Sequence, residues 1–250
     1  QRGFDVVVFD KRDEIGGNLH VAKKPPFKGK FEWAIDYYKS MAKKLNITMK
    51  LGKEVTAQEV LALKPYSILV ATGSNVISIP LEGLDQVQTV QAHDVLANDM
   101  QFANKKVVVI GGGITGLETA LYINRQGTNQ VSVVDMLPEW PVDMLDMRYQ
   151  NEALLEVRHC NDQGVALFYN NKVVKFADGK LFIESTKDGE VKELPADVIV
   201  LSVGVKPNDA LWQELLASGH SSVWKAGDAI ATGKINKAVL HGSKFGYSLN

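Results

Sequence analysis

The stretch VVVIGGGITGLETALYINRQGTNQVSVVD, residues 107–135, decides the fold. A short apolar strand ends at a run of glycines, a helix follows, and a second strand ends on Asp135. Gly111, Gly113 and Gly116 therefore form a GxGxxG pattern between a strand and a helix, the context that makes the pattern specific. There the first glycine makes the turn, the second admits a pyrophosphate, and the third lets the helix approach the strand. The stretch predicts a dinucleotide site, and the alternative is a turn that merely needs glycine.

The end of the second strand predicts which nucleotide binds. N–H groups at the helix start face an anion, and the helix dipole favours its negative charge. Asp135 lies where an acidic side chain accepts hydrogen bonds from an adenosine ribose. Met136 and Leu137 follow it, so no arginine is present to bind a 2′-phosphate, and the charge of Asp135 would repel one. We therefore expect NADH rather than NADPH.

The composition fits an ordinary globular protein. The formal net charge is −1 and 45% of the residues are hydrophobic, so we expect neither nucleic acid nor a membrane as a partner. No apolar run has membrane-spanning length and no signal peptide opens the chain, which favours a cytoplasmic location. Cys160 is the one cysteine, which excludes an internal disulfide and predicts a buried helix residue. Histidines without ligand spacing predict no metal site, and the cluster of Lys23, Lys24, Lys28 and Lys30 is interpreted as a solvated loop.

The chain repeats its own plan. Residues 1–10 (QRGFDVVVFD) match residues 125–135 in their helix end, glycine, strand and final acid, and PYSILVATG (65–73) matches PADVIVLSVG (195–204). This predicts an α/β protein with two Rossmann-like dinucleotide-binding domains, the second inserted in the first. We expect the first domain over 1–98 and 222–250 and the second over 99–221. Judged by the second, the first lacks about 20 to 25 residues, a strand and a glycine loop, unless it is a degenerate unit.

Other elements follow from periodicity and capping signals. Residues 31–45 have helical spacing of apolar side chains, and 46–52 (NITMKLG) reads as a strand. Thr56 and Glu59 form a capping box that starts a short helix. A further helix is expected over 144–161. Residues 165–194 alternate apolar and polar side chains, with turns at Asp178–Gly179 and Asp188–Gly189, which predicts an antiparallel meander in the inserted domain.

Three features of the outer domain point to a second nucleotide. Asp10 ends a strand as Asp135 does, and Lys11 and Arg12 beside it could reach adenine or phosphate. Residues 14–18 (EIGGN) contain a glycine pair that admits a flat or anionic group, although a plain surface turn would also use it. Asp228, within KAGDA (225–229), could bind a polyol hydroxyl or simply cap a helix.

Taken in order, DKRDEIGGNL, ILVATGS, GGGITGLETA, VIVLSVGVKPN and KAGDA resemble flavoproteins with two dinucleotide-binding domains. More closely, almost the whole chain resembles the C-terminal half of the old yellow enzyme-like NADH:flavin oxidoreductases. This group contains 2-enoate reductase, 2,4-dienoyl-CoA reductase and trimethylamine dehydrogenase. In that family a flavin-binding TIM barrel with a cysteine-ligated iron–sulfur cluster precedes this half. The resemblance implies FAD and NADH as ligands here, with FMN and a 4Fe-4S cluster expected only in the barrel, which is the implied partner.

The resemblance also implies roles for individual residues. Asp10 would bind the AMP ribose of FAD, and Asp228 would meet its ribityl chain. Glu118 would lie towards the nicotinamide and Asp135 would bind the adenosine ribose of NADH. The remaining cofactor-binding residues lie in the same motifs. On the FAD side they are Lys11, Gly16, Gly17, Asn18, Thr72, Gly73 and Gly227. Around the NADH pyrophosphate they are Gly111, Gly113, Thr115 and Gly116. Gly204, which ends the VIVLSVG strand, is also expected to bind cofactor.

The implied activity is electron input, in which NADH reduces FAD and electrons pass on to reduce an unsaturated substrate. Hydride transfer needs alignment of two rings and exclusion of water, so no catalytic acid or base is expected from the chain. A binding domain that holds ADP or FAD without NADH turnover is the alternative. A disulfide reductase of the glutathione reductase type is excluded because no CxxC pair is present. Because the first glycine loop is missing, we expect the chain by itself to be inactive.

Overall fold

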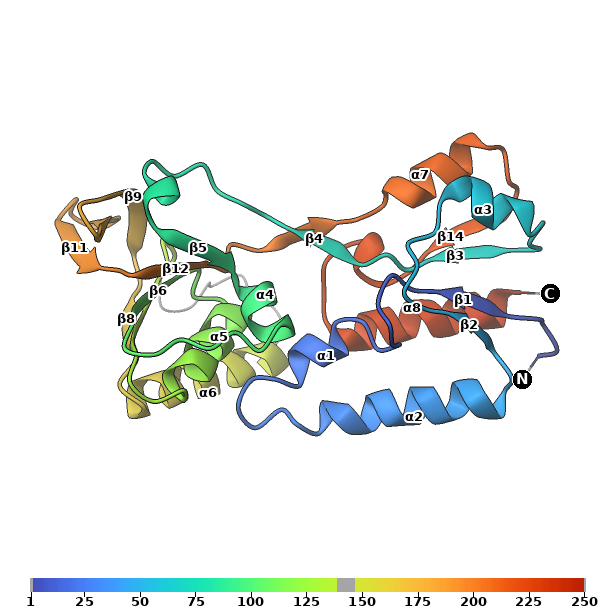
Figure 1. The fold of residues 1–250 in the computed structure, drawn as a ribbon, viewed down its shortest axis with the longest axis horizontal. Coiled ribbons are helices and arrows are strands. Elements are labelled where there is room, and N and C mark those ends of the chain that lie inside the picture. Colours follow the sequence, from blue (N-terminus) through green and yellow to red (C-terminus); the bar gives the residue numbers. More distant parts are fainter. Residues whose placement is uncertain (1, 139–146, 250) are drawn as a thin grey trace. The chain divides into compact units, whose positions relative to one another are not determined.

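The computed structural model describes residues 2–138 and 147–249, which divide into two compact units (Figure 1). Unit 1 comprises residues 1–17, 35–77 and 204–250, and unit 2 comprises 18–34 and 78–203. These borders differ from the predicted domain boundaries after 98 and 221. Residues 78–98 group with unit 2 because their strand pairs with the central sheet, and 204–221 group with unit 1 because their strand and helix contact its elements.

Unit 2 is built on a five-stranded parallel sheet. Its order is β5 (Gln88–Gln91), β12 (Val198–Leu201), β6 (Lys106–Ile110), β7 (Gln130–Val134) and β8 (Ala166–Phe168). The central strands β6 and β12 are almost wholly apolar, as expected for a parallel sheet that is covered on both faces. The chain crosses from β6 to β7 through a helix, which is the βαβ unit that the glycine pattern predicts.

Alternate residues of the central strands face two separate cores. Val107 and Val109 of β6 pack with the helices, whereas Val108 and Ile110 pack on the opposite side. Helices α4 (Ala92–Ala97), α5 (Ile114–Asn124) and α6 (Met147–Asp162) contribute to the first core, and α5 packs against β6, β7 and α6. Cys160 on α6 is fully buried in this core, as predicted, and burial raises the pKa of its thiol to about 12.

The second face of the sheet is covered by an antiparallel meander of β9 (Asn171–Ala177), β10 (Lys180–Ser185) and β11 (Val191–Pro195). Ala177 pairs with Lys180, so Asp178 and Gly179 form a two-residue turn with both φ angles positive, the type I′ geometry that suits a hairpin. The meander begins later than predicted, because β8 pairs in parallel with β7 and belongs to the central sheet. The alternation of apolar and polar residues in β8 fits both a parallel strand of the central sheet and an antiparallel strand of the meander.

Unit 2 also includes residues 18–34, which contain the short helix α1 (Leu19–Ala22). Helix α1 packs against α4, and a short 3-10 helix, η1 (Leu84–Gln86), lies against β5 and β9. The helix predicted over 144–161 is α6, and residues 144–146 lie outside the described part of the chain.

Unit 1 contains its strands in pairs. The parallel pairs are β1 (Val7–Phe9) with β2 (Thr48–Lys50) and β3 (Ile68–Val70) with β14 (Val223–Lys225). The antiparallel pair joins β4 (Ser74–Val76) to β13 (Val205–Pro207). Among the described residues, no strand lies between β1 and β3, whereas in unit 2 the equivalent strands β7 and β12 flank β6.

Among the described residues, three α-helices lie wholly in unit 1, namely α3 (Ala57–Ala62), α7 (Ala210–Ala217) and α8 (Ile235–Ser248), together with the 3-10 helix η2 (Gly227–Ala229). Helix α2 (Phe31–Lys44) begins in unit 2 and continues in unit 1 from Ile35. Thr56 and Glu59 form the predicted capping box at the start of α3. A small core surrounds Ile68, Val70 and Leu215. Across the described residues of both units, no helix is long and apolar enough to span a membrane.

Candidate functional site

The loop between β6 and α5 has a shape that requires glycine at two positions. Gly111 has φ 110°, and a Cβ atom there would lie 2.2 Å from the carbonyl oxygen of Ser202. A Cβ atom at Gly116 would lie 1.9 Å from the carbonyl oxygen of Gly111. Both distances are far below van der Waals contact with backbone atoms that cannot move aside. These glycines therefore let α5 pack directly on the β6 turn.

Gly113 differs, because no atom lies within 4 Å of the position that its Cβ would occupy. It is exposed and forms the N-cap of α5 with φ −68° and ψ 174°, which other residues also adopt. The first backbone bond of α5 runs from Leu117 N–H to Gly113 O. Within the described residues, no hydrogen bond engages the N–H groups of Ile114 to Gly116. The open surface and free donors fit an anion at this helix terminus.

Thr115 is exposed in this first turn of α5, and its carbonyl accepts a hydrogen bond from the Thr119 hydroxyl. The Thr115 hydroxyl has no hydrogen-bond partner in the described part of the chain. The first turn of α5 itself contains no acidic residue.

Asp135 follows β7 and is fixed beside this loop. One carboxylate oxygen accepts a hydrogen bond from Gly112 N–H at 2.6 Å, and the other accepts from Leu137 N–H at 2.8 Å. Each oxygen retains a lone pair for a hydroxyl ligand. Met136 and Leu137 beside it are exposed, at 61% and 47% of their surface, and offer no charge for a phosphate group. The carboxylate is thus held next to the glycine loop, as the GxGxxG context predicted.

Glu118 is buried one turn further along α5 and forms an ion pair with Lys28. Lys28 also contacts Glu152 at 2.7 Å. Burial raises the pKa of Glu118, and the hydrogen bond from Lys28 only partly offsets this effect. Burial acts to lower the pKa of Lys28, but its two carboxylate partners leave that pKa raised. The Glu118 carboxyl group is therefore held by Lys28 on the buried side of α5.

The basic cluster lies in a loop, as interpreted, but three of its lysines form ion pairs instead of facing only solvent. Lys23 pairs with Glu32 at 2.5 Å, Lys24 pairs with Asp99 at 2.5 Å, and Lys28 is the bridging cation described above. Lys30 is exposed and lies over the Trp33 ring. Glu32 is nine positions from Lys23, but Asp99, Glu118 and Glu152 are distant in sequence, so the local charge pattern did not show these pairs.

In unit 1, Asp10 repeats the local geometry of Asp135. Its carboxylate accepts a hydrogen bond from Arg12 N–H at 2.9 Å, two residues ahead, as Asp135 does from Leu137. Lys11 beside it is exposed. Gly16 and Gly17 have φ angles of 124° and 50°, so the glycine pair adopts backbone conformations that other residues rarely take. Asn18, where unit 2 begins, is exposed, and its side chain accepts no capping hydrogen bond at the start of α1.

Asp228 lies in a second polar group of unit 1. It accepts hydrogen bonds from the Ser74 hydroxyl at 3.2 Å and from Gly233 N–H at 3.0 Å. Gly227 has φ 61°, and its N–H donates to Nδ1 of His241 at 3.2 Å. Asp228 does not cap α8 directly. It binds Gly233, the residue just before the N-cap of α8, so the helix-cap alternative is supported only in part.

Thr72, Gly73 and Gly204 adjoin this group. The Thr72 hydroxyl donates to Asn208 O at 2.5 Å, and Gly73 O accepts from Asn208 N–H at 3.0 Å. Gly204 O accepts from Ile77 N–H at 3.0 Å where β4 and β13 meet. These contacts tie the strand end to the loop that carries Asp228.

Three residues that support these sites were not predicted. Lys28 neutralises Glu118, Ser74 binds Asp228, and His241 holds Gly227. Ser74 directly follows the ATG strand end, so proximity could have suggested it. Lys28 and His241 act over long sequence separations and no local pattern marks them. Among the described residues, no group of three or more His, Cys, Asp or Glu side chains could hold a metal ion.

Known proteins share this arrangement. The sequence model of the family described as pyridine nucleotide-disulphide oxidoreductase matches residues 20–236. The chain is 30% identical to NADH oxidase of Thermoanaerobacter brockii, covering 100% of this chain and 38% of that protein. It is 33% identical to bilirubin reductase of Mediterraneibacter gnavus, over 83% of this chain and 31% of that protein. A solved 2-naphthoyl-CoA reductase complex matches with TM-score 0.89 and 27% identity, over 100% of this chain and 37% of that chain. The chain spans less than two fifths of these relatives.

Proposed function

The chain belongs to the pyridine nucleotide-disulphide oxidoreductase family, and on that premise we propose that it is an electron-input module that takes a hydride from NADH and delivers it to FAD. The observation that carries the proposal is the open terminus of α5. Gly113 leaves space where a side chain would stand, and the N–H groups behind it have no partner among residues 2–138 and 147–249, so they could bind a pyrophosphate. Asp135, fixed beside them, would accept the adenosine ribose hydroxyls.

Glu118 would face the nicotinamide end of the bound NADH in this proposal. It lies on α5 beyond the anion-binding turn and is buried together with Lys28. A carboxylate already bridged to a lysine keeps a defined position, and its charge would orient the nicotinamide carboxamide through a hydrogen bond. Alignment of this kind is what hydride transfer requires from the protein.

For FAD, Asp10 and the glycine pair would hold the AMP portion, with Asp228 on the ribityl hydroxyls. Bound FAD would supply the chemistry of accepting two electrons as a hydride and releasing them one at a time. The residues present fit part of this ligand, since Asp10 and Asp228 each keep acceptor capacity beyond their backbone partners. Among the described residues, unit 1 offers no counterpart of the β6 to α5 loop for the pyrophosphate.

We infer that in the whole protein a strand equivalent to β6 lies between β1 and β3. The internal repeat supports this, because the matching strands β7 and β12 both pair with β6. Apolar side chains of unit 1 are also exposed, Val6 and Val7 near β1 by 43% and 41%, and Val239 and Leu240 on α8 by 46% and 50%. Such a strand and its following helix would cover apolar surface and bring the second glycine loop.

The rest of the protein would then receive the electrons. Relatives more than twice as long as this chain support a further domain. We propose that this domain is an FMN-binding TIM barrel with a 4Fe-4S cluster, which reduces an unsaturated substrate. The experiment that tests the function is to mix the full-length protein with FAD and NADH without oxygen. Bleaching of the flavin band supports electron input, whereas bound flavin that NADH never bleaches would favour the structural-nucleotide alternative.

NADH should bind the chain more tightly than NADPH. The Asp135 carboxylate would accept the ribose 2′-hydroxyl but repel a 2′-phosphate, and its neighbours Met136 and Leu137 are uncharged. Calorimetric titration gives the dissociation constant of each nucleotide. The ratio of the NADPH constant to the NADH constant should be smaller in the Asp135→Ala variant. Equal affinities in the unchanged chain would refute the role of Asp135.

The 250-residue chain should purify colourless, without stoichiometric FAD. Charge-assisted hydrogen bonds from a glycine loop to a pyrophosphate contribute about 1.5 to 3 kcal/mol each, so the absence of several weakens binding by orders of magnitude. An absorption spectrum after purification with added FAD checks this. A flavin band near full occupancy would show that the described residues of unit 1 suffice for FAD binding.

A further inference from the structure

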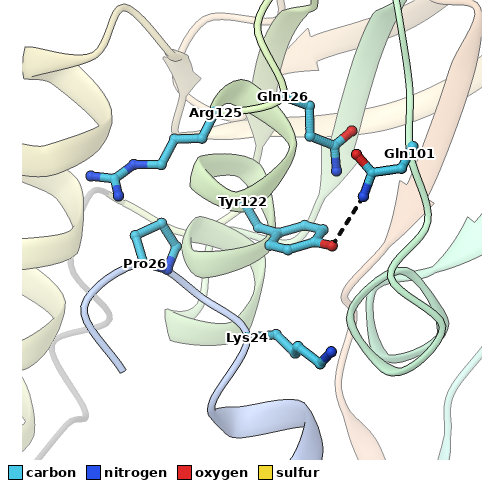
Figure 2. A pocket seen from close by; sticks show the side chains of 6 residues that line it. All are labelled: Lys24, Pro26, Gln101, Tyr122, Arg125 and Gln126. Carbon is cyan, nitrogen blue, oxygen red and sulfur yellow. Dashed lines mark hydrogen bonds between the residues drawn. The ribbon is translucent and has the colours of Figure 1, made fainter. Parts of the chain in front are cut away.

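A surface cavity of about 370 Å³ lies in unit 2, away from the glycine loop. Figure 2 shows its wall, which comes from the C-terminal half of α5, from the loop after α4 and from the segment after α1. The lining residues are Lys24, Pro26, Gln101, Tyr122, Arg125 and Gln126. Its volume is within the range of small-molecule sites.

Most polar groups of the wall are engaged in ways that fix their positions. Gln126 bonds the backbone of both Met100 and Phe102, and Lys24 pairs with Asp99. The Tyr122 hydroxyl donates to Asp99 at 3.2 Å. These side chains therefore already have hydrogen-bond or ion-pair partners within the protein.

Arg125 is the exception. Its Nε donates to Gln163 Oε1 at 3.2 Å, and its guanidinium carbon lies over the Phe27 ring, 4.5 Å from the ring centroid. A guanidinium carries five N–H donors, and the bond to Gln163 uses the one on Nε. Its terminal nitrogens have no hydrogen-bond partner in the described part of the chain. Counting Lys24 and Arg125 against Asp99, the described residues at the cavity leave one positive charge without an acidic partner.

Apolar surface accompanies this charge. The ring of Tyr122 lies across the cavity between Pro26 and Gln101, with its hydroxyl towards Gln101 (Figure 2). The Pro26 ring and the Tyr122 ring therefore offer flat surfaces in the same cavity wall as Arg125. A fork of N–H donors next to such surfaces matches a carboxylate attached to a flat body.

We propose that this cavity is a second ligand site, separate from the nucleotide site, for a small monocarboxylate with a flat aromatic or unsaturated body. The carboxylate binds the free edge of Arg125, and the flat body packs on Tyr122 and Pro26. One negative charge balances the one excess positive charge of the wall. Phe27, which holds φ 69° under the guanidinium of Arg125, keeps this cation in place before the ligand arrives.

The test uses benzoate as the probe and the whole chain as the protein, with binding measured by isothermal titration. Benzoate should bind saturably, at one site, and Arg125→Met should weaken it at least tenfold. Arg125→Lys keeps the positive charge but lacks the planar guanidinium, so its affinity for benzoate should lie between those of the unchanged chain and the Arg125→Met variant. Acetate, which lacks the ring, and benzamide, which lacks the charge, should each bind at least tenfold more weakly than benzoate. Arg158→Met is the matched control, because Arg158 is an exposed cation on α6 outside the cavity, and it should leave benzoate binding unchanged.

Saturating NADH should leave the benzoate affinity unchanged, which separates this site from the proposed nucleotide site. Because Arg125 also holds Phe27, Gln101→Glu provides a second variant at an exposed position and should weaken benzoate tenfold by repulsion. Failure of benzoate to saturate, equal binding by the Arg125→Met chain, or displacement by NADH would each overturn the proposal. None of these results depends on whether the chain oxidises NADH.

Discussion

Replacing Gly113 with valine should weaken NADH binding by at least two orders of magnitude, about 2.8 kcal/mol, while the melting temperature stays unchanged. The Cβ position of Gly113 is open and its backbone angles suit any residue, so the fold tolerates the side chain. The added methyl groups would stand where the pyrophosphate must approach the backbone. Titration with NADH and a thermal melt of the same preparation measure both effects.

Gly116→Ala is the matched variant at the start of the same helix. In contrast to Gly113→Val, it should lower the stability of the fold. Its Cβ would lie 1.9 Å from Gly111 O, so the change should destabilise the fold by about 3 kcal/mol through overpacking. Gly246→Ala serves as a control, since its Cβ meets no atom within 4 Å and it lies in unit 1. A Gly113→Val chain that binds NADH normally would contradict the proposed position of the pyrophosphate.

Lys28→Met should lower the free energy of unfolding by about 3 to 5 kcal/mol at pH 8, because it leaves the buried Glu118 carboxylate without its cation. Adding Glu118→Gln to this variant should restore most of the loss, since the unpaired charge is then removed. Lys180→Met is the control, as Lys180 pairs with Glu193 on the exposed surface of the meander and should change stability little. Urea unfolding of the four proteins provides the comparison.

The loss in free energy of unfolding caused by Lys28→Met should depend on pH. Burial already raises the pKa of Glu118 in the folded chain, so this group destabilises the folded state at high pH, and the penalty disappears as the carboxyl is protonated. Loss of Lys28 raises that pKa further. The difference between variant and unchanged chain should therefore shrink as the pH falls from 8 towards 5. A deficit that stays constant over this range would show that packing, and not the charge of Glu118, causes it.

Local sequence signals predicted much of the fold. The order of β6, α5 and β7 with Asp135 at the end was confirmed, and so was the capping box of Thr56 and Glu59. These features depend on residues a few positions apart, so a single segment contains the whole signal. The resemblance to NADH:flavin oxidoreductases was confirmed as well, since its motifs are short and have fixed spacing.

What the sequence did not predict depends on contacts between distant segments. The pairing of β8 with β7 is indistinguishable from a meander strand by alternation alone. Lys28 reaches Glu118 across 90 positions, and the His241 contact with Gly227 joins a helix to a loop. Tertiary packing sets these contacts, and no neighbouring residue signals them. The assignments of cofactor-binding residues remain predictions that the experiments above address.

The single thiol of this chain, Cys160, can serve as a built-in probe of local opening in unit 2. Cys160 is fully enclosed between α5 and α6, and its raised pKa keeps it protonated at neutral pH, so a thiol reagent cannot modify it in the closed state. Modification then requires α6 to separate from α5, and its rate reports the equilibrium for that local opening. Labelling kinetics of the unmodified chain would give the opening free energy of the proposed NADH-binding unit without any engineered probe. A nucleotide that binds the closed unit would slow the labelling in proportion to its saturation.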